Sequence, residues 1–196
     1  MRIDTRALNR ATLGRQMLLR RKSRDVADAV RRVVALQAQH PASPYLALWN
    51  RLTDFGPAAL DAAFTGYEVV KATLMRLTLH AVHAADYQSF REAMEPTLRA
   101  VMILRADGFT ASGLSAAHAD ALIPDLLAYA DRPRTATEMQ AWVERRLGTP
   151  RDQHVWRGLR GYAPLLYAPT QALWSLGARP SYIAAKRRPA LADPVA

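Results

Sequence analysis

Apolar positions in the first forty or so residues recur at the spacing of short amphipathic helices. One helix is predicted within residues 8–19, and Asp25 is a suitable N-cap for a second one. Pro41 disfavours the α conformation at the residue before it, so the second helix is expected to end near Gln39. The apolar stripe of this helix is expected to comprise Val26, Val30, Val33, Val34 and Gln37.

The following stretch changes from helical to strand-like periodicity. Short helices are predicted over residues 43–52 and 57–64, where prolines stand at or near the first helical position. Residues 67–84 are rich in alternating β-branched side chains, which predicts a β-hairpin or two adjacent strands. Helical periodicity returns at Asp86 and continues to about residue 104.

The second half of the chain carries clearer helix boundaries. A further helix should end near residue 133, and Thr135 with Glu138 then forms the sequence pattern of a capping box. The helix that this capping box starts is expected to end at Gly148. Two short strands are predicted over residues 164–169 and 180–185.

Three helices followed by a two-stranded hairpin is the order of elements in a winged helix, a relative of the helix-turn-helix. The last of these helices is expected to start at Asp152, with Val155, Trp156 and Leu159 facing inward and Arg157 and Arg160 outward. Residues 1–84 show a looser version of the same order. We therefore expect a mainly α protein with small β-hairpins (α+β), built from tandem winged-helix units.

Composition changes along the chain indicate three segments. Residues 1–108 are expected to form an N-terminal helical and winged-helix unit, and residues 109–185 a second winged helix. A polar, small-residue stretch at 110–120 marks the boundary between them. The basic end of the chain, residues 186–196, is expected to be a disordered tail.

The overall composition is that of an intracellular globular protein. Half of the 196 residues are apolar, which is enough to bury a core. No cysteine occurs, so disulfides and thiolate metal sites are excluded. The N-terminus is charged, and no apolar run approaches the roughly 20 residues that span a bilayer. We expect a cytoplasmic, nucleoid-associated protein that does not contact the membrane.

The positive charge is concentrated at the N-terminus. The chain has a net charge of +10, and residues 1–35 supply +7 of it, with nine arginines and one lysine against three aspartates. Such a block is typical of a nucleic-acid contact, of a solvated helix face or of a contact with an anionic membrane, and arginine forks favour phosphate. The candidate DNA contacts are Arg20, Arg21, Lys22, Arg24, Arg31 and Arg32, with Arg157 and Arg160 in the second half.

Common catalytic motifs are missing from the sequence. The five histidines form no HxxxH pair with carboxylates, and His80 and His83 stand three apart in a predicted strand, where side chains point to opposite faces. Glycines are scattered singly, so no phosphate-binding loop is expected, and no GxSxG elbow occurs. We therefore expect neither a metal nor a cofactor.

Gln37 and Gln39 flank Ala38 at the expected end of the second helix. In one interpretation their amides satisfy the free carbonyls of a helix C-terminus. In the other they form a functional pair, because Gln37 lies on the predicted apolar stripe while Gln39 lies on the side of Arg24 and Arg31. The pair would then stand where the core meets the basic face.

Several separated blocks in the same order resemble the AlkZ-like winged-helix DNA-binding family. The resemblance extends from about Leu8 to Ala185 and includes the runs VADAVRRVVALQAQHPASPYLALWNRL, VVKATLMRLTLHAVHAADY, RPRTATEMQAWVERRLG and LWSLGARPSYIAA. It implies tandem winged helices around a concave surface that binds duplex DNA. It also implies a DNA glycosylase acting on bulky N-alkylated purines and interstrand crosslinks, with Gln37 and Gln39 as the catalytic pair.

One feature departs from the family pattern. Members of full length continue well beyond the LWSLGARPSYIAA block, so this chain is expected to correspond to the N-terminal half. Two functions therefore stay open: a truncated glycosylase, or a non-catalytic winged-helix DNA-binding module or regulator. A surface left uncovered by the missing part is expected to favour self-association.

Overall fold

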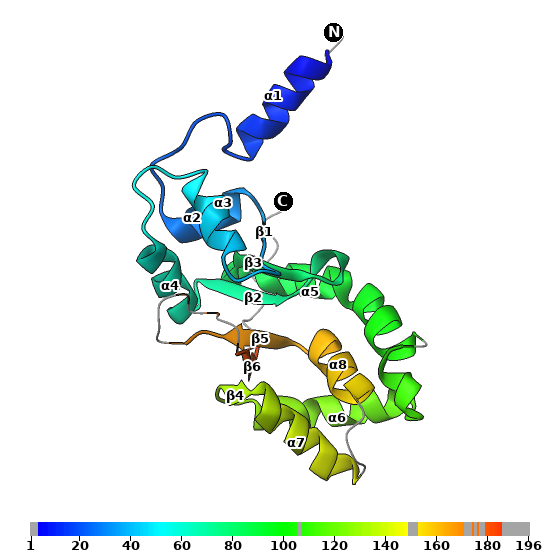
Figure 1. Cartoon of the computed structure of the whole chain (residues 1–196). Coiled ribbons are helices and arrows are strands. Elements are labelled where there is room, and N and C mark those ends of the chain that lie inside the picture. Colours follow the sequence, from blue (N-terminus) through cyan, green and yellow to red (C-terminus); the bar gives the residue numbers. More distant parts are fainter. Residues whose placement is uncertain are drawn as a thin grey trace, which may run out of the picture.

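The computed structural model is mainly helical and contains two small antiparallel sheets (Figure 1), which confirms the expected α+β class. The structure describes residues 4–105, 107–148, 153–170, 174, 176 and 179–185. Asp152, the expected start of a helix, and the basic tail 186–196 lie outside these residues. In the described part of the chain, no helix is long and apolar enough to cross a membrane.

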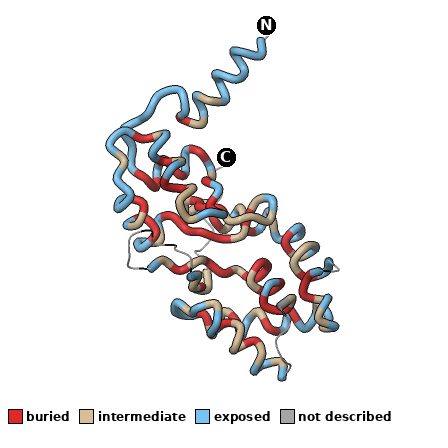
Figure 2. Tube along the Cα trace, in the orientation of Figure 1, coloured by how far each residue is buried: buried red, intermediate tan, exposed pale blue. Residues whose placement is uncertain are grey.

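The first half folds in the predicted order, with one short strand added. The helices are α1 (Thr5–Arg15), α2 (Val26–Arg32), α3 (Ser43–Trp49) and α4 (Pro57–Thr65). The strands are β1 (Leu36–Gln37), β2 (Val69–Thr73) and β3 (Leu79–His83), with a single 3₁₀ turn, η1 (Met75–Leu77), in the hairpin. Helix α1 has no buried residue and projects from the body (Figures 1 and 2).

Helix α2 is shorter than predicted, which corrects the expected position of the glutamine pair. Asp25 caps α2 as expected, its carboxylate accepting from the backbone N–H of Ala27 at 2.7 Å. The helix ends at Arg32, and Val34 adopts a left-handed conformation with φ of 76°. The next residues pair with β3, because a strand partner is available for their backbone groups. Of the expected stripe, Val26, Val30 and Val33 are buried, whereas Val34 and Gln37 are exposed.

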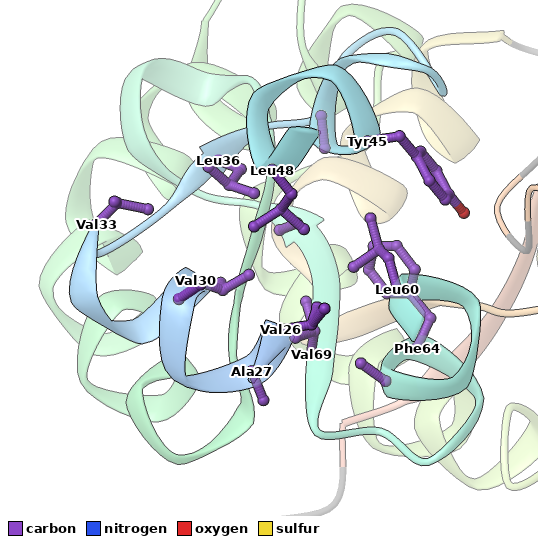
Figure 3. Packing of buried hydrophobic residues seen from close by; sticks show 14 of the residues in the cluster. Val26, Ala27, Val30, Val33, Leu36, Tyr45, Leu48, Leu60, Phe64 and Val69 are labelled. Carbon is purple, nitrogen blue, oxygen red and sulfur yellow. The ribbon is translucent and has the colours of Figure 1, made fainter. Parts of the chain in front are cut away.

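The first sheet has the strand order β1-β3-β2 and separates two hydrophobic clusters. Leu36 pairs with Ala81, which pairs with Lys71, so this row lies on one face. Leu36 and Ala81 pack on that face against α2, α3 and α4, as Figure 3 shows for Leu36 and its labelled neighbours. The opposite face carries Val70 and Val82, which belong to a different cluster.

The second half contains the predicted elements and one strand that was not predicted. Its helical elements are α5 (Ala84–Arg99), which continues as a π-helical turn η2 (Ala100–Leu104), η3 (Phe109–Ser112), α6 (Ala116–Tyr129), α7 (Ala136–Leu147) and α8 (Gln153–Tyr162). Strands β4 (Arg134–Thr135), β5 (Leu165–Ala168) and β6 (Ser181–Ala184) form a sheet of order β4-β6-β5. The short strand β4 is the unpredicted one.

The predicted boundaries of α7 are confirmed in detail. Thr135 and Glu138 form the complete capping box of α7, and Gly148 ends that helix with a left-handed φ of 65°. Glycine also allows α8 to lie close to η2, since a Cβ at Gly158 would stand 2.7 Å from the carbonyl oxygen of Met102. Val155, Trp156 and Leu159 of α8 are buried and Arg157 is exposed, as expected.

The two sheets are topologically equivalent and pack through equivalent residues. In each half the order is helix, strand, two helices and two strands, and the first strand of the three pairs with the last. Comparing the paired residues of the two sheets matches β2 with β5 and β3 with β6. In this comparison Val70 corresponds to Leu166 and Val82 to Ile183. All four side chains belong to one cluster between the sheets. The two halves therefore pack together through residues at corresponding positions.

Helix α5 and its continuation η2 connect the two halves in sequence. Their buried side chains belong to the hydrophobic core of the second half. Leu98 and Ile103 are fully buried in the cluster that contains Leu126, Met139 and Leu159. The boundary near residue 108 stays a prediction.

Candidate functional site

The segment Gln37-Ala38-Gln39 runs along the outer edge of the first sheet. Gln37 is the last residue of β1, and the backbone N–H of Ala38 donates to the carbonyl oxygen of Leu79 at 2.8 Å. Ala38 is fully buried, whereas both glutamines are exposed. Gln37 ends the strand and Gln39 follows at a bend, so both exposed side chains lie at this edge of the sheet. The arrangement is an exposed pair of amides anchored by a buried methyl group.

Gln39 also contributes to the sheet. Its amide oxygen accepts a hydrogen bond from the backbone N–H of Leu79 at 3.2 Å. The expectation that these glutamines stand at a helix C-terminus is wrong, because the chain is extended here. The bond does show that the Gln39 side chain satisfies a backbone group, here a strand N–H rather than a helix carbonyl.

Two residues of the β2–β3 hairpin were missed as site candidates: His80, which adjoins Gln37 in the sheet, and Arg76, whose charge acts on His80. His80 pairs directly with Gln37 in the strand register. Arg76, at the hairpin turn, is exposed and has a left-handed backbone (φ 53°, ψ 24°). The sequence predicts His80 in a strand and suggests only a metal ligand for it. The β1 strand, which brings Gln37 opposite His80, is not predicted by the local pattern.

His80 is held as a neutral ring. The side chain is 5% exposed, and its Nδ1 lies 3.1 Å from the carbonyl oxygen of Thr78. Burial lowers the pKa of His80 below its ordinary value, the positive charge of Arg76 lowers it further, and the bond to Thr78 opposes the shift. The imidazole beside Gln37 is therefore uncharged at neutral pH.

The basic residues between α1 and α2 lie on an exposed segment. Arg20, Arg21, Lys22 and Arg24 are all exposed. The guanidinium of Arg21 lies 4.3 Å from the ring centroid of Trp49, itself 53% exposed on α3. The backbone of Lys22 bridges to the end of α3, where its N–H donates to Arg51 O at 2.8 Å. The segment is thus fixed to the first half, with its cations facing solvent.

Arg31 and Arg32 occupy the last turn of α2, six and five residues before Gln37, respectively. Arg31 forms an ion pair with Asp86 of α5 at 3.3 Å, and its side chain remains 54% exposed. Arg32 is exposed. The two arginines therefore differ, since one carries a carboxylate partner within the protein.

Arg157 and Arg160 are not brought to the glutamine pair. They lie on α8, which Figure 1 shows well separated from β1. Arg157 is exposed with a guanidinium 4.0 Å from the Asp107 carboxylate, and Arg160 is partly buried. The structure thus brings Gln37 and Gln39 beside the strand of His80, with Arg76 at the turn of the same hairpin. It places the N-terminal cations on the same half and leaves the α8 cations on the other.

The described residues contain no group of three or more histidine, aspartate or glutamate side chains arranged for a metal ion. The amide pair, the neutral imidazole and the arginine at the hairpin turn can orient water, accept hydrogen bonds and attract phosphate.

Three comparisons with known proteins bear on this site. Residues 30–196 match the family model described as DNA glycosylase AlkZ-like. No curated protein matches the chain. The fold is similar to that of the Streptomyces sahachiroi DNA glycosylase AlkZ, with a TM-score of 0.76 and 18% identity over 94% of this chain and 50% of that one. The chain therefore spans about half the length of that solved structure.

Proposed function

Because the chain belongs to the AlkZ-like DNA glycosylase family, we propose that it binds duplex DNA and hydrolyses the N-glycosidic bond of bulky N-alkylated purines. The observation that carries the proposal is the exposed pair of amides, Gln37 and Gln39, which flank the buried Ala38 at the edge of the first sheet. In this proposal the pair stands at the reacting sugar, and no metal or cofactor is required.

Neutral amides are suited to this chemistry. A purine alkylated at N7 or N3 is already cationic, so the C1′–N bond breaks with its electron pair leaving on the base, and the base becomes neutral. The sugar then carries positive charge, which the amide carbonyl oxygens stabilise while they orient the attacking water. The water oxygen bonds to C1′ and its proton passes to solvent. A bulky lesion also reduces the need for a deep pocket around a flipped base.

Phosphate contacts would supply most of the affinity for DNA. The exposed cations Arg20, Arg21, Lys22, Arg24 and Arg32 lie on the half that carries the glutamine pair, and arginine binds phosphate oxygens bidentately. Arg157 and Arg160 would contact the backbone from the second half, with each half docking as a winged helix. Such binding would associate the protein with the nucleoid.

The second candidate is a DNA-binding module without chemistry. The observation that favours it is the set of exposed cations on the first half, which can bind phosphates without any chemistry. Exposed apolar side chains, among them Leu46 and Trp49 on α3, support a further proposal of self-association. A monomer at high concentration in sedimentation would contradict that part.

The test is single-turnover release of an N7-alkylguanine from a defined duplex by the wild-type chain, Gln37→Ala and Gln39→Ala. Each substitution should slow release by about 10²- to 10³-fold, the usual effect of losing one electrostatic contact to a transition state. Fluorescence anisotropy should show unchanged DNA affinity. If the wild type binds DNA but releases nothing, the chain is a binding module. Release that survives both substitutions would refute the role of the pair.

A further inference from the structure

The proposed function leaves one buried titratable side chain of the first sheet without a role. His80 lies in the middle of β3 and is 5% exposed, next to the exposed Gln37 in the same cross-strand row. The row continues into the sheet as Gln37, His80 and Ala72, all on the face turned toward the second sheet. A buried polar ring thus adjoins an exposed amide.

The backbone pairing places these two side chains as close as an antiparallel sheet allows. The Ala38 N–H donates to the carbonyl oxygen of Leu79, which makes Gln37 and His80 a pair without hydrogen bonds between their own backbones. In such pairs the Cα atoms stand about 4.5 Å apart and side chains are nearest. The His80 and Gln37 side chains therefore start from adjacent positions, and the Gln37 amide is within reach of the ring.

The protonation state of His80 follows from its other contact. Its Nδ1 lies 3.1 Å from the Thr78 carbonyl oxygen, which can only accept a hydrogen bond, so Nδ1 carries the proton. Burial lowers the pKa of the ring, and at neutral pH Nε2 is left with a free lone pair. An amide N–H₂ group is a fitting donor to that lone pair.

We propose that His80 is a positioning residue for Gln37: its Nε2 accepts a hydrogen bond from the Gln37 amide nitrogen and so turns the Gln37 carbonyl oxygen outward. The oxygen then faces the water and the sugar, whereas a freely rotating amide would present nitrogen half of the time. The close approach of the two residues follows from the sheet, the hydrogen bond between their side chains is the proposal, and its catalytic consequence rests on the proposed function.

The second sheet lacks this arrangement at the corresponding place. The registers align Gln37 with Thr135 and His80 with Ser181. Thr135 is occupied in the capping box of α7, with its hydroxyl 2.8 Å from the Glu138 carboxylate. The imidazole and amide pair is thus specific to the first sheet.

The contact is tested by ¹⁵N NMR on the full chain, independently of any activity. The Gln37 side-chain N–H₂ signal, assigned by its loss in Gln37→Ala, should shift in His80→Phe, which keeps a ring but removes the acceptor. It should stay near its wild-type position in His80→Gln, whose amide oxygen can replace Nε2. His83→Asn is the control, because His83 lies on the opposite face and Asn can keep its capping bond to Ala85. An unmoved signal in His80→Phe, or a proton on His80 Nε2, would overturn the proposal.

The functional consequence is tested by a double-mutant cycle. His80→Phe should slow single-turnover base release about tenfold, the scale for groups that orient a functional side chain, with unchanged half-saturation by DNA. His80→Gln should restore the rate, and His80→Phe should have no further effect in Gln37→Ala while keeping its effect in Gln39→Ala. Additive losses in Gln37→Ala would refute positioning through Gln37. If the wild type releases no base, the proposed function fails, and the NMR result still decides whether His80 holds Gln37.

Discussion

The two halves of the molecule share one arrangement of elements and differ in how they use its first strand. Both place a two-residue strand against the last strand of a hairpin. In the second sheet, β4 is occupied by structural contacts: Arg134 donates to the Tyr129 carbonyl oxygen at 2.9 Å, and Thr135 caps α7. In the first sheet, Gln37 on β1 stays exposed. The same backbone position thus serves stability in one half and carries an exposed amide in the other.

The packing of the two halves brings unlike residues at corresponding positions into contact. Lys71 and Tyr167 occupy corresponding positions, since each is opposite the central residue of its register, Ala81 and Tyr182 respectively. They also contact each other, with the Lys71 ammonium 5.0 Å from the Tyr167 ring centroid. The buried Lys71 side chain therefore links the two halves through its contact with the Tyr167 ring. Because burying an ammonium group costs free energy, the first half contributes a destabilising group to this contact.

The largest stability effects should be equal in the two halves. Leu48 on α3 and Met139 on α7 are both fully buried, and truncation of each to alanine should cost about 2–5 kcal/mol in the free energy of unfolding. Because equivalent residues of both sheets share one cluster, urea denaturation followed by circular dichroism should show a single transition for both variants. Two separated transitions in Met139→Ala would show that the halves unfold independently.

The buried lysine predicts a pH dependence that belongs to the first half. Burial lowers the pKa of Lys71 from 10.5 to about 8. Above pH 8 the folded lysine is neutral while the unfolded one still binds a proton, so stability rises with pH toward 10.5. Between pH 7 and 9.5, urea unfolding should therefore show a gain of about 1–2 kcal/mol for wild type relative to Lys71→Met. Equal pH profiles for the two proteins would mean that Lys71 is solvated.

The capping box of the second half predicts a smaller loss of stability. Thr135→Ala removes the bond between the threonine hydroxyl and the Glu138 backbone N–H, 3.2 Å long, and should lower the free energy of unfolding by about 1 kcal/mol. Thermal denaturation measures this change. Thr135→Ser keeps the hydroxyl and is the matched control. If Thr135→Ala were as stable as Thr135→Ser, the structural role assigned to β4 would be wrong.

The smallest expected effect distinguishes two neighbouring arginines. For duplex DNA, log affinity should fall with log salt with a slope of about −3 to −6, corresponding to a few phosphate contacts. Arg32→Ala should flatten this slope by about one unit, and Arg31→Ala by less, because Arg31 is already paired with Asp86. Anisotropy titrations at several salt concentrations measure both. A slope near zero for the wild type would contradict phosphate-dominated binding.

Local signals in the sequence predicted most helix boundaries and failed where a distant partner decides the structure. Asp25, Thr135 with Glu138, and Gly148 act through neighbouring backbone groups, and each stands where predicted. Residues 36–39 continue a helical apolar pattern, but their backbone pairs with residues 79–81, which are distant in sequence. The glutamine pair could therefore be named from resemblance, while its extended geometry and its neighbour His80 could not.

The central claim is that the first strand is chemical in one half and structural in the other. The most direct measurement compares single-turnover release of an N7-alkylguanine by Gln37→Ala and by Thr135→Ala, which are corresponding positions. Release should slow by about 10²- to 10³-fold in Gln37→Ala and stay within about twofold of wild type in Thr135→Ala, at a temperature where both are folded. Equal losses in the two variants, or none in Gln37→Ala, would contradict the account.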